Sequence, residues 1–197
     1  MPRTYELKKR AERQQDTRRR IVQAAVDLHG TIGPARTTVS AIAERAGVQR
    51  HTYYRYFPDD RALGMACSGL HLEQNPVPDP EPWRQIADPA DRLAKGLGEL
   101  YAWYERNEQM LTNVTRDSET DPVVAEIAAL RFGPPLQAMT EVLSKGLVEG
   151  RDRRRGVAAL RLALEFRTWR SLGRDSGLTR KDAVATMVAA VRCAGSH

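Results

Sequence analysis

The sequence has little cysteine and no long hydrophobic run. Its two cysteines, Cys67 and Cys193, stand far apart in 197 residues, and neither has a cysteine or histidine at the spacing of a zinc ligand pair. This excludes a disulfide framework and a zinc module, so a reducing cytoplasm is the expected location. No stretch reaches the ~18–20 apolar residues of a membrane-spanning helix, and the charged N-terminus lacks the apolar segment of a secretory signal.

Motifs typical of enzymes are also absent. The sequence has no phosphate-binding P-loop, no H-E-x-x-H and no G-x-S-x-G. The run from His71 to Glu73 matches half of a zinc deaminase motif, but the P-C-x-x-C half is missing. Asp117, Glu119 and Asp121 are expected to lie in a solvated loop rather than to bind a cation. We therefore predict no catalytic residue, no metal and no cofactor.

The net charge of +6 is concentrated near the N-terminus. Residues 1–74 contain 13 Lys or Arg and 8 Asp or Glu, whereas the remainder is almost neutral. Eight basic and three acidic residues fall within positions 1–20. Such a segment favours a polyanionic partner, most simply nucleic acid, and the alternative is a solvated, disordered tail.

Apolar residues recur at helical spacing, and alternating β-branched strands are absent, which predicts an all-α chain. We expect helices at about 16–32, 38–46, 50–57, from 58 onward, 89–110, 122–149 with a break at Gly133-Pro134-Pro135, 156–173 and 179–194. Four prolines at alternate positions from 76 to 82 mark a domain boundary. Residues 1–15 are expected to be a flexible basic arm, 16–74 an N-terminal domain and 83–197 a C-terminal helical domain.

Residues 38–57 predict a helix-turn-helix, with a turn at Gly47 between two short helices. In this motif the second helix enters the major groove of DNA. A helical wheel divides the second helix into a largely aromatic face, suited to packing on the first helix, and a polar face, suited to contacting base edges and phosphates. The first face has Gln49, Tyr53, Tyr56 and Phe57; the second has Arg50, His51, Tyr54 and Arg55. The alternative is an ordinary helix pair with a solvated polar face.

The run T-V-x-x-I-A-x-x-A-G-V, followed by T-x-Y-x-Y-F, resembles the DNA-binding signature of the tetracycline-repressor (TetR) family of bacterial transcriptional regulators. The likeness extends over about Arg18 to Leu70. It implies an all-α homodimer with an N-terminal three-helix, helix-turn-helix DNA-binding domain. The C-terminal helical domain would then bind a small-molecule effector and dimerise.

The resemblance also implies roles for single residues. Thr38 would cap its helix near a phosphate. Two positions depart from the family pattern: His51 stands where glycine is common, and Asp60 stands where lysine is common, with Arg61 beside it as the expected substitute. The complete set of residues predicted to face DNA is Thr38, Ser40, Gln49, Arg50, His51, Thr52, Tyr54, Arg55, Tyr56 and Arg61.

The C-terminal part is rich in aromatic and methionine residues at helical spacing. Such side chains either line an apolar ligand pocket or form ordinary core, and the sequence leaves both open. The candidate effector-binding residues are Tyr101, Tyr104, Met110, Phe132, Met139, Glu165, Phe166 and Trp169. Glu165 is a candidate partner for a cationic effector, although Arg161, four residues earlier, offers an ordinary ion pair.

The last two predicted helices favour a dimer seam. Val184, Met187, Val188 and Val191 repeat at helical spacing beside alanines that allow close approach. The expected protein is thus a cytoplasmic homodimeric transcriptional regulator that binds an inverted repeat in double-stranded DNA, most simply a repressor released by an effector. It is expected to be neither an enzyme nor a membrane protein. The alternatives are an activator of the same fold and a helical enzyme without a recognised motif.

Overall fold

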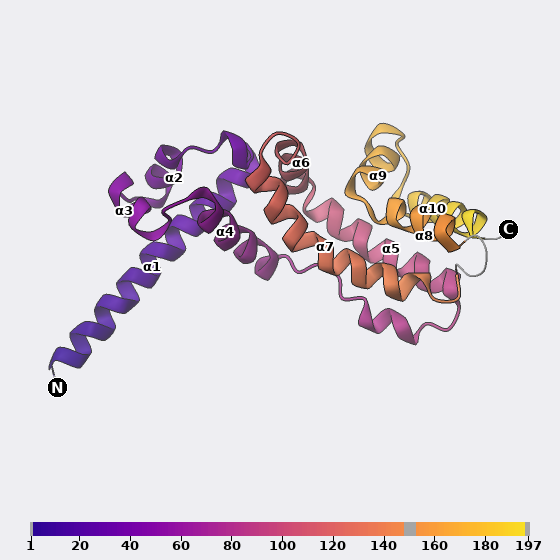
Figure 1. The fold of residues 1–197 in the computed structure, drawn as a ribbon, viewed down its shortest axis with the longest axis horizontal. Coiled ribbons are helices and arrows are strands. Elements are labelled where there is room, and N and C mark those ends of the chain that lie inside the picture. Colours follow the sequence, from indigo (N-terminus) through magenta and orange to yellow (C-terminus); the bar gives the residue numbers. More distant parts are fainter. Residues whose placement is uncertain (1, 148–152, 196–197) are drawn as a thin grey trace. The chain divides into compact units, whose positions relative to one another are not determined.

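The computed structural model describes residues 2–147 and 153–195, with side chains from residue 8 onward. These residues form helices joined by turns, with no strand among them, so the all-α prediction is confirmed. No helix in this described part is long and apolar enough to cross a membrane. The elements in Figure 1 are α1 (Pro2–Thr31), η1 (Pro34–Arg36), α2 (Val39–Ala46), α3 (Arg50–Tyr56), α4 (Asp60–Gln74), η2 (Glu81–Gln85), α5 (Pro89–Arg106), α6 (Glu108–Asp117), α7 (Pro122–Ser144), α8 (Arg153–Leu164), α9 (Phe166–Arg170), the π-turn η4 (Ser171–Asp175) and α10 (Arg180–Ala194).

The chain divides into two compact units. The first contains the residues up to Pro76 together with Gln109–Arg131, and the second contains Val77–Glu108 and the chain from Phe132 onward. The proline-rich stretch therefore lies at a boundary. The first unit also includes most of α6 and the first half of α7, which the sequence pattern assigns to the C-terminal domain.

The first unit contains a small helical core, which we call the head. Helix α1 packs on both α2 and α4, and the buried side chains include Ile21, Ile42 and Leu63. The side chain of Thr38 accepts the N–H of Ala41 at the start of α2, and Asp59 caps α4 in the same way. Helices α2 and α3 begin and end within one residue of their predicted limits, and α4 begins two residues after its predicted start.

Helix α1 differs from its prediction, because it begins at Pro2 rather than near residue 16. The expected flexible arm is therefore helical in the structure. Residues 6–15 consist of Glu, Leu, Lys, Arg, Ala and Gln, all good helix formers. The apolar stripe predicts a start near residue 16, but a helix can continue without such a stripe.

Helix α7 also differs, because it continues through Pro134 and Pro135. Each proline removes one backbone donor, which usually breaks a helix. Both halves of α7 have packing that holds them: Ile127 is buried before the prolines, and Met139 and Leu143 are buried after them. The prediction of a break at this point is wrong.

The predicted helix 156–173 is divided in the structure into α8, α9 and the π-turn. The hydroxyl of Tyr101 donates to the carbonyl of Ala163 at 2.9 Å, and that of Tyr104 donates to the carbonyl of Leu164. These bonds satisfy carbonyls at the end of α8 that have no partner within the helix. Likewise, the predicted helix 89–110 ends at Arg106, and α6 follows after Asn107.

The predicted dimer stripe on α10 is wrong for two of its residues. Met187 and Val191 are buried within their own unit, where α10 packs against α5 and α8. Val184 and Val188 are half-buried, and the exposed residues on α10 include Ala185, Ala189 and Ala190. Periodicity identified the apolar side of this helix, but that side faces its own subunit.

The turn between α1 and α2 depends on Gly33. Its φ of 98° lies in the left-handed region, which side chains disfavour. A Cβ atom there would collide with the side chains of Arg116 and Asp117 from α6. By contrast, Gly98 lies inside α5, and a Cβ atom added there meets open space.

Replacing these two glycines with alanine should have opposite effects. Gly33→Ala should lower the free energy of unfolding by at least about 1 kcal/mol, because the backbone is strained and the added methyl group collides. Gly98→Ala should raise it by about 0.5–1 kcal/mol through helix propensity. Urea unfolding followed by circular dichroism measures both, and a neutral Gly33→Ala would show that the turn adopts another conformation.

Candidate nucleic-acid interface

Two aromatic side chains anchor the short helix α3 to the head. Tyr53 and Phe57 are each 1% exposed, and their ring centroids lie 6.1 Å apart. Burial, aided by the charge of Asp60, raises the pKa of Tyr53 to about 12, so the phenol remains neutral in the core. An isolated helix of seven residues is unstable in water, so these contacts determine where α3 lies.

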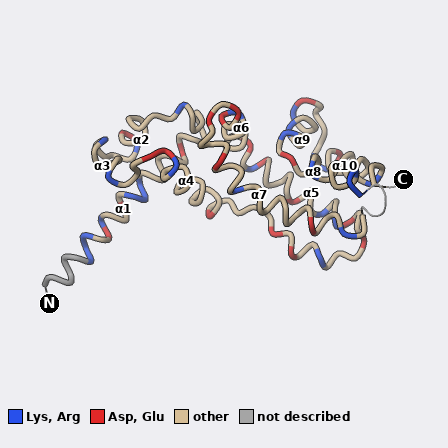
Figure 2. Tube along the Cα trace, viewed as in Figure 1, with Lys and Arg blue, Asp and Glu red and all other residues tan. Residues whose placement is uncertain are grey.

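The opposite face of α3 is polar and open to solvent, as the helical wheel predicts. Arg50, His51, Tyr54 and Arg55 are exposed, and Tyr54 retains 48% of its accessible surface. Its ring packs edge-on against Tyr53 at 5.4 Å, which holds the phenol in an outward position. The blue segments on α3 in Figure 2 mark the basic residues of this face.

The other predicted residues of α3 lie beside this face. The hydroxyl of Thr52 lies 3.2 Å from the Nε2 atom of His51, and Arg55 donates to the hydroxyl of Tyr56 at 3.4 Å. Thr52 and Tyr56 are half-buried. Gln49 is exposed at the N-cap position without a capping bond, so its placement on the packing face is wrong and its placement among the DNA-facing residues stays a prediction.

The start of α2 adds two exposed hydroxyl groups, those of Thr38 and Ser40. The hydroxyl of Thr38 accepts the N–H of Ala41 at 3.2 Å and still has its own hydrogen to donate. The turn after α2 is closed by Gly47, whose φ of 65° is left-handed. These hydroxyls and the polar face of α3 together offer exposed hydrogen-bonding groups on α2 and α3.

Arg61 has a different environment from the other predicted DNA-facing residues. Its Nε and Nη2 atoms donate to Oε1 of Glu126 in α7, at 3.0 and 2.8 Å. Next to this pair, a Cβ atom on Gly64 would collide with Ile127, so α4 and α7 are closely packed here. The guanidinium of Arg61 thus joins α4 to α7, while its phosphate contact stays a prediction.

Several arginines outside the predicted DNA-facing set have defined contacts within the head. Arg18 lies over the ring of Phe57, 5.2 Å from its centroid, and Arg20 donates to the carbonyl of Ala46 at 3.1 Å. Arg45 of α2 donates twice to Asp27 of α1, at 3.1 and 3.0 Å. These arginines fix α2 and α3 to α1, and charge counting alone gives no signal for such roles.

Side chains of α6 cap the C-terminal end of α1. Asn113 donates to the carbonyls of His29 and Gly30, at 3.0 and 3.1 Å. Arg116 donates to the carbonyl of Ile32 and forms an ion pair with Asp117. The head is therefore tied to α6 through backbone carbonyls that would otherwise lack partners.

Asp117 is 4% exposed, so its assignment to a solvated loop is wrong. Burial alone would raise its pKa. The bonds that it accepts from Arg116 and from the N–H of Ala35, however, hold the pKa below its usual range. The carboxylate closes the turn that leads from α1 into α2.

His29 and Cys67 meet inside the head, with Sγ 3.4 Å from Nδ1. Burial lowers the pKa of His29 to about 4, although the charge of Asp117 opposes this, and it raises the pKa of Cys67 to about 12. Both groups are neutral near pH 7, and they form neither a thiolate–imidazolium pair nor an activated nucleophile.

Most of the candidate effector-binding residues form one aromatic cluster in the second unit. Tyr104 contacts Tyr101, Phe166 and Trp169, with ring centroids 5.4 to 6.2 Å apart. Met139 in α7 is also buried in this unit, and Phe132 contacts Trp103. Met110 is separate, because it packs against the head.

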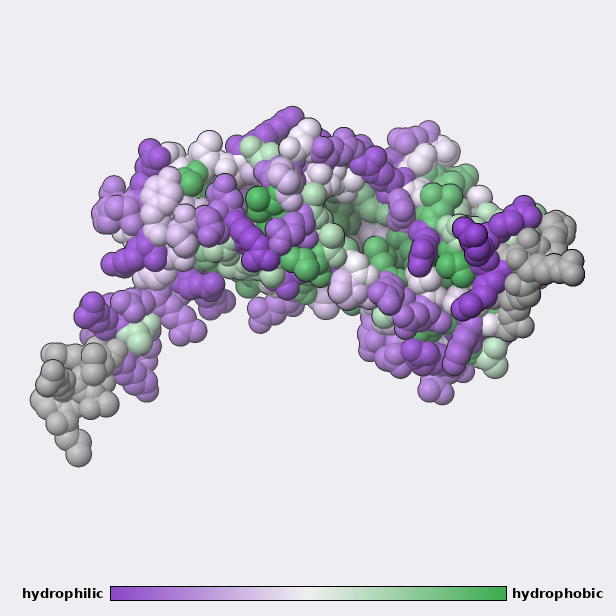
Figure 3. Space-filling model, viewed as in Figure 1, coloured by the Kyte–Doolittle hydropathy of each residue, from purple (hydrophilic) through white to green (hydrophobic). Residues whose placement is uncertain are grey.

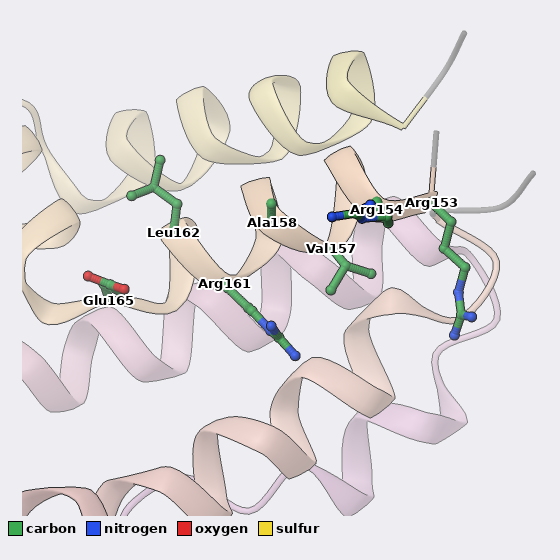
Figure 4. Close-up of a pocket in the computed structure, with 7 residues that line it drawn as sticks. All are labelled: Arg153, Arg154, Val157, Ala158, Arg161, Leu162 and Glu165. Atoms are coloured by element: carbon green, nitrogen blue, oxygen red, sulfur yellow. The ribbon is translucent and has the colours of Figure 1, made fainter. Parts of the chain in front are cut away.

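Glu165 is exposed and lies at the end of α8, beside a surface hollow of about 690 Å³ (Figure 4). All the lining residues come from α8 and the position after it: Arg153, Arg154, Val157, Ala158, Arg161, Leu162 and Glu165. The hollow therefore lies along one helix and does not include the aromatic cluster.

A segment of the head matches a known protein family. Residues 21–63 match the family model described as bacterial regulatory proteins, tetR family, which confirms the resemblance seen in the sequence. An HTH-type transcriptional regulator of Mycobacterium tuberculosis (strain CDC 1551 / Oshkosh) is 40% identical over 57 residues, 29% of this chain and 30% of that protein. The HTH-type transcriptional repressor KstR of Mycolicibacterium smegmatis is 29% identical over 106 residues, 54% of this chain and 52% of KstR. The chain thus matches about half or less of the length of these relatives.

The fold extends beyond the matched segment. The transcriptional regulator FadR of Bacillus subtilis, solved in complex with stearoyl-CoA, superposes with a TM-score of 0.59 at 19% identity. The superposition covers 90% of this chain and 97% of FadR. At this identity the likeness shows the fold: an N-terminal helix-turn-helix domain followed by further helices.

Buried His29 predicts that the head loses stability in mild acid. Its pKa is about 4 when folded and about 6.5 when unfolded, so protons bind the unfolded state more readily. The stability that neutral, buried His29 contributes is complete above about pH 6.5 and is lost as the pH falls towards 4. Stability should drop by about 2 kcal/mol at pH 5.

Urea unfolding from pH 7.5 to 5 measures this loss, with His29→Gln as the variant that cannot titrate. The wild type should lose more stability than the variant over this range. Proton NMR of the His29 ring gives its pKa directly, and a value near 6.5 would contradict the burial argument.

Proposed function

We propose that this chain is a transcriptional regulator that binds an inverted repeat in double-stranded DNA as a homodimer. The match of residues 21–63 to the tetR family of bacterial regulatory proteins supports this role. In this proposal it is a repressor, located in the cytoplasm, and a small-molecule effector releases it from DNA. KstR, with which it shares 29% identity over 106 residues, is described as a repressor. The relatives and structural neighbours are regulators, which favours this function over an enzyme.

The observation that supports DNA binding most directly is that α3 has one buried aromatic side and one exposed polar side. Tyr53 and Phe57 hold one side of the helix in the core, and they leave Arg50, His51 and Tyr54 pointing to solvent. An arginine can donate two hydrogen bonds to a guanine edge in the major groove, and a phenol can donate to a phosphate. The exposed starts of α2 and α3 place further donors beside them.

An effector site in the second unit is supported by the aromatic cluster around Tyr104. Rings of this size line apolar pockets between helices, and their two hydroxyls are already bonded to backbone carbonyls. The pocket would therefore present mainly apolar surface. FadR was solved with stearoyl-CoA, a ligand with a long apolar chain, which fits this character.

A dimer seam on α8 and α10 is supported by the surface that these helices leave uncovered. Leu162 is 55% exposed, and Ala158, Ala185 and Ala189 lie exposed on the same pair of helices. On the face drawn in Figure 3, apolar surface appears over α8 to α10 next to hydrophilic side chains. Two copies joined across a two-fold axis would cover this surface and part of the hollow on α8.

Replacing Arg50 tests the proposed DNA contact. A binding site selected from a random duplex library serves as the probe, and affinity is measured by fluorescence anisotropy. Arg50→Ala should weaken binding by about 5- to 150-fold, equivalent to about 1–3 kcal/mol for a bidentate base contact. The binding of a duplex with an unrelated sequence should change much less.

The matched control is Arg84→Ala, which removes the same charge from η2 in the second unit. It should leave selected-site affinity unchanged. Equal affinities of wild type and a folded Arg50→Ala variant would remove Arg50 from the interface.

Replacing Leu162 tests the dimer seam. Because this side chain is exposed within the subunit, Leu162→Glu should leave the subunit folded while burying an unpaired charge between two copies. Sedimentation should show a monomer, and affinity for the full inverted repeat should fall. Leu130→Glu is the control, since Leu130 is 49% exposed but lies on α7. A Leu162→Glu dimer that binds normally would place the seam elsewhere.

A further inference from the structure

The N-terminal part of α1 is a charged helix whose side chains are almost all exposed. Every side chain from Lys8 to Arg20 is exposed except Thr17, which is half-buried. Seven basic and two acidic residues fall in this range. Figures 1 and 2 show this part of α1 extending alone beyond α2, α3 and α4, with basic residues along it. We call residues 8–20 the extension.

The face of α1 that packs in the head continues into the extension and becomes polar. Ile21 and Ala25 are fully buried. Counting back from them at helical spacing, Arg18, Gln14 and Arg10 fall on the same face, and all three are exposed. The face of α1 that is apolar within the head thus has Arg18 and Arg10 in the extension, with the neutral Gln14 between them.

The extension leaves the head next to the proposed DNA interface. Arg18 covers the ring of Phe57, the residue that follows α3. Arg20 donates to the carbonyl of Ala46, the last residue of α2, and also pairs with Asp16 at 3.4 Å. The C-terminal end of the extension therefore contacts the end of α3 and the end of α2.

We propose that the extension is a second DNA-binding element: a preformed helix whose basic residues contact the phosphates of duplex DNA flanking the site that α3 reads. This inference rests on the proposed function, since it takes the DNA to lie against α3. Phosphates attract Lys and Arg without regard to base sequence, so the extension adds affinity and length of contact rather than specificity.

The helical state gives the extension a defined reach. From Arg18 back to Lys8, a rise of 1.5 Å per residue gives about 15 Å. This length corresponds to about four or five base pairs at 3.4 Å per step. A disordered arm with the same charge would lack this fixed direction. A substitution that breaks the helix but keeps the charge therefore distinguishes a preformed helix from a disordered arm.

The experiment compares two duplexes that contain the same selected site, one without flanks and one with 10 base pairs on each side. The wild type should bind the flanked duplex at least 10-fold more tightly at low salt. Replacing Lys8, Lys9, Arg10 and Arg13 with glutamine should remove this advantage. The slope of log affinity against log salt should become shallower by about 2–4, since each lost phosphate contact removes ~0.9. The affinity for the duplex without flanks should remain within about threefold.

Two further variants test whether the charge and the helical conformation of the extension, rather than mutation of the segment as such, determine the preference for flanks. Replacing Gln15 with alanine alters the same segment without changing its charge and should retain the preference for flanks. Ala11→Pro keeps every charge but interrupts the helix, and it should lose most of the preference. Circular dichroism reports the change in helix content.

The outcomes distinguish this inference from the proposed function. A wild type that binds the duplex without flanks tightly but gains nothing from flanks would overturn the inference alone. Full retention of the preference in Ala11→Pro would refute the preformed helix. If the glutamine variant lost affinity for polyuridylate but kept its preference for flanks, the extension would serve RNA instead. Failure of the wild type to bind any duplex would remove the proposed function as well.

Discussion

The head depends on the burial of Tyr53 and Phe57 in its core. Helix α3 has seven residues, too few to be stable alone, so these two rings determine both its existence and its orientation. Once they are buried, the helical repeat places Arg50, His51 and Tyr54 on the opposite side, in solvent. Arg18 covers Phe57 and Arg20 holds the end of α2, so the same anchoring residues also fix the point where the extension leaves the head.

The head could be predicted closely from the sequence because its signals are local. Thr38 and Asp59 are N-cap residues, Gly47 provides the left-handed turn, and the aromatic residues of α3 repeat on one face. Each signal acts within a few residues, so no knowledge of distant contacts is needed. The resemblance to the TetR family rests on the same local pattern, and the match over residues 21–63 confirms it.

The second unit and the links to α6 could not be predicted in the same way, because distant contacts determine them. The end of α8 depends on hydroxyls of Tyr101 and Tyr104, about sixty residues earlier. Asp117 is buried because α6 packs on the end of α1, which its acidic neighbours in the sequence do not indicate. Met187 lies on an apolar stripe, but periodicity does not say whether such a stripe faces its own subunit or a partner. Which aromatic residues contact an effector stays a prediction for the same reason.

The most direct test of the account is dimethyl sulfate protection on a selected duplex. This reagent methylates N7 of guanine in the major groove and N3 of adenine in the minor groove. If the polar face of α3 reads DNA in a two-fold dimer, protein should protect guanine N7 atoms in two clusters about 34 Å apart, on one side of the duplex. Protection confined to adenine N3, or to a single unrepeated cluster, would contradict the account.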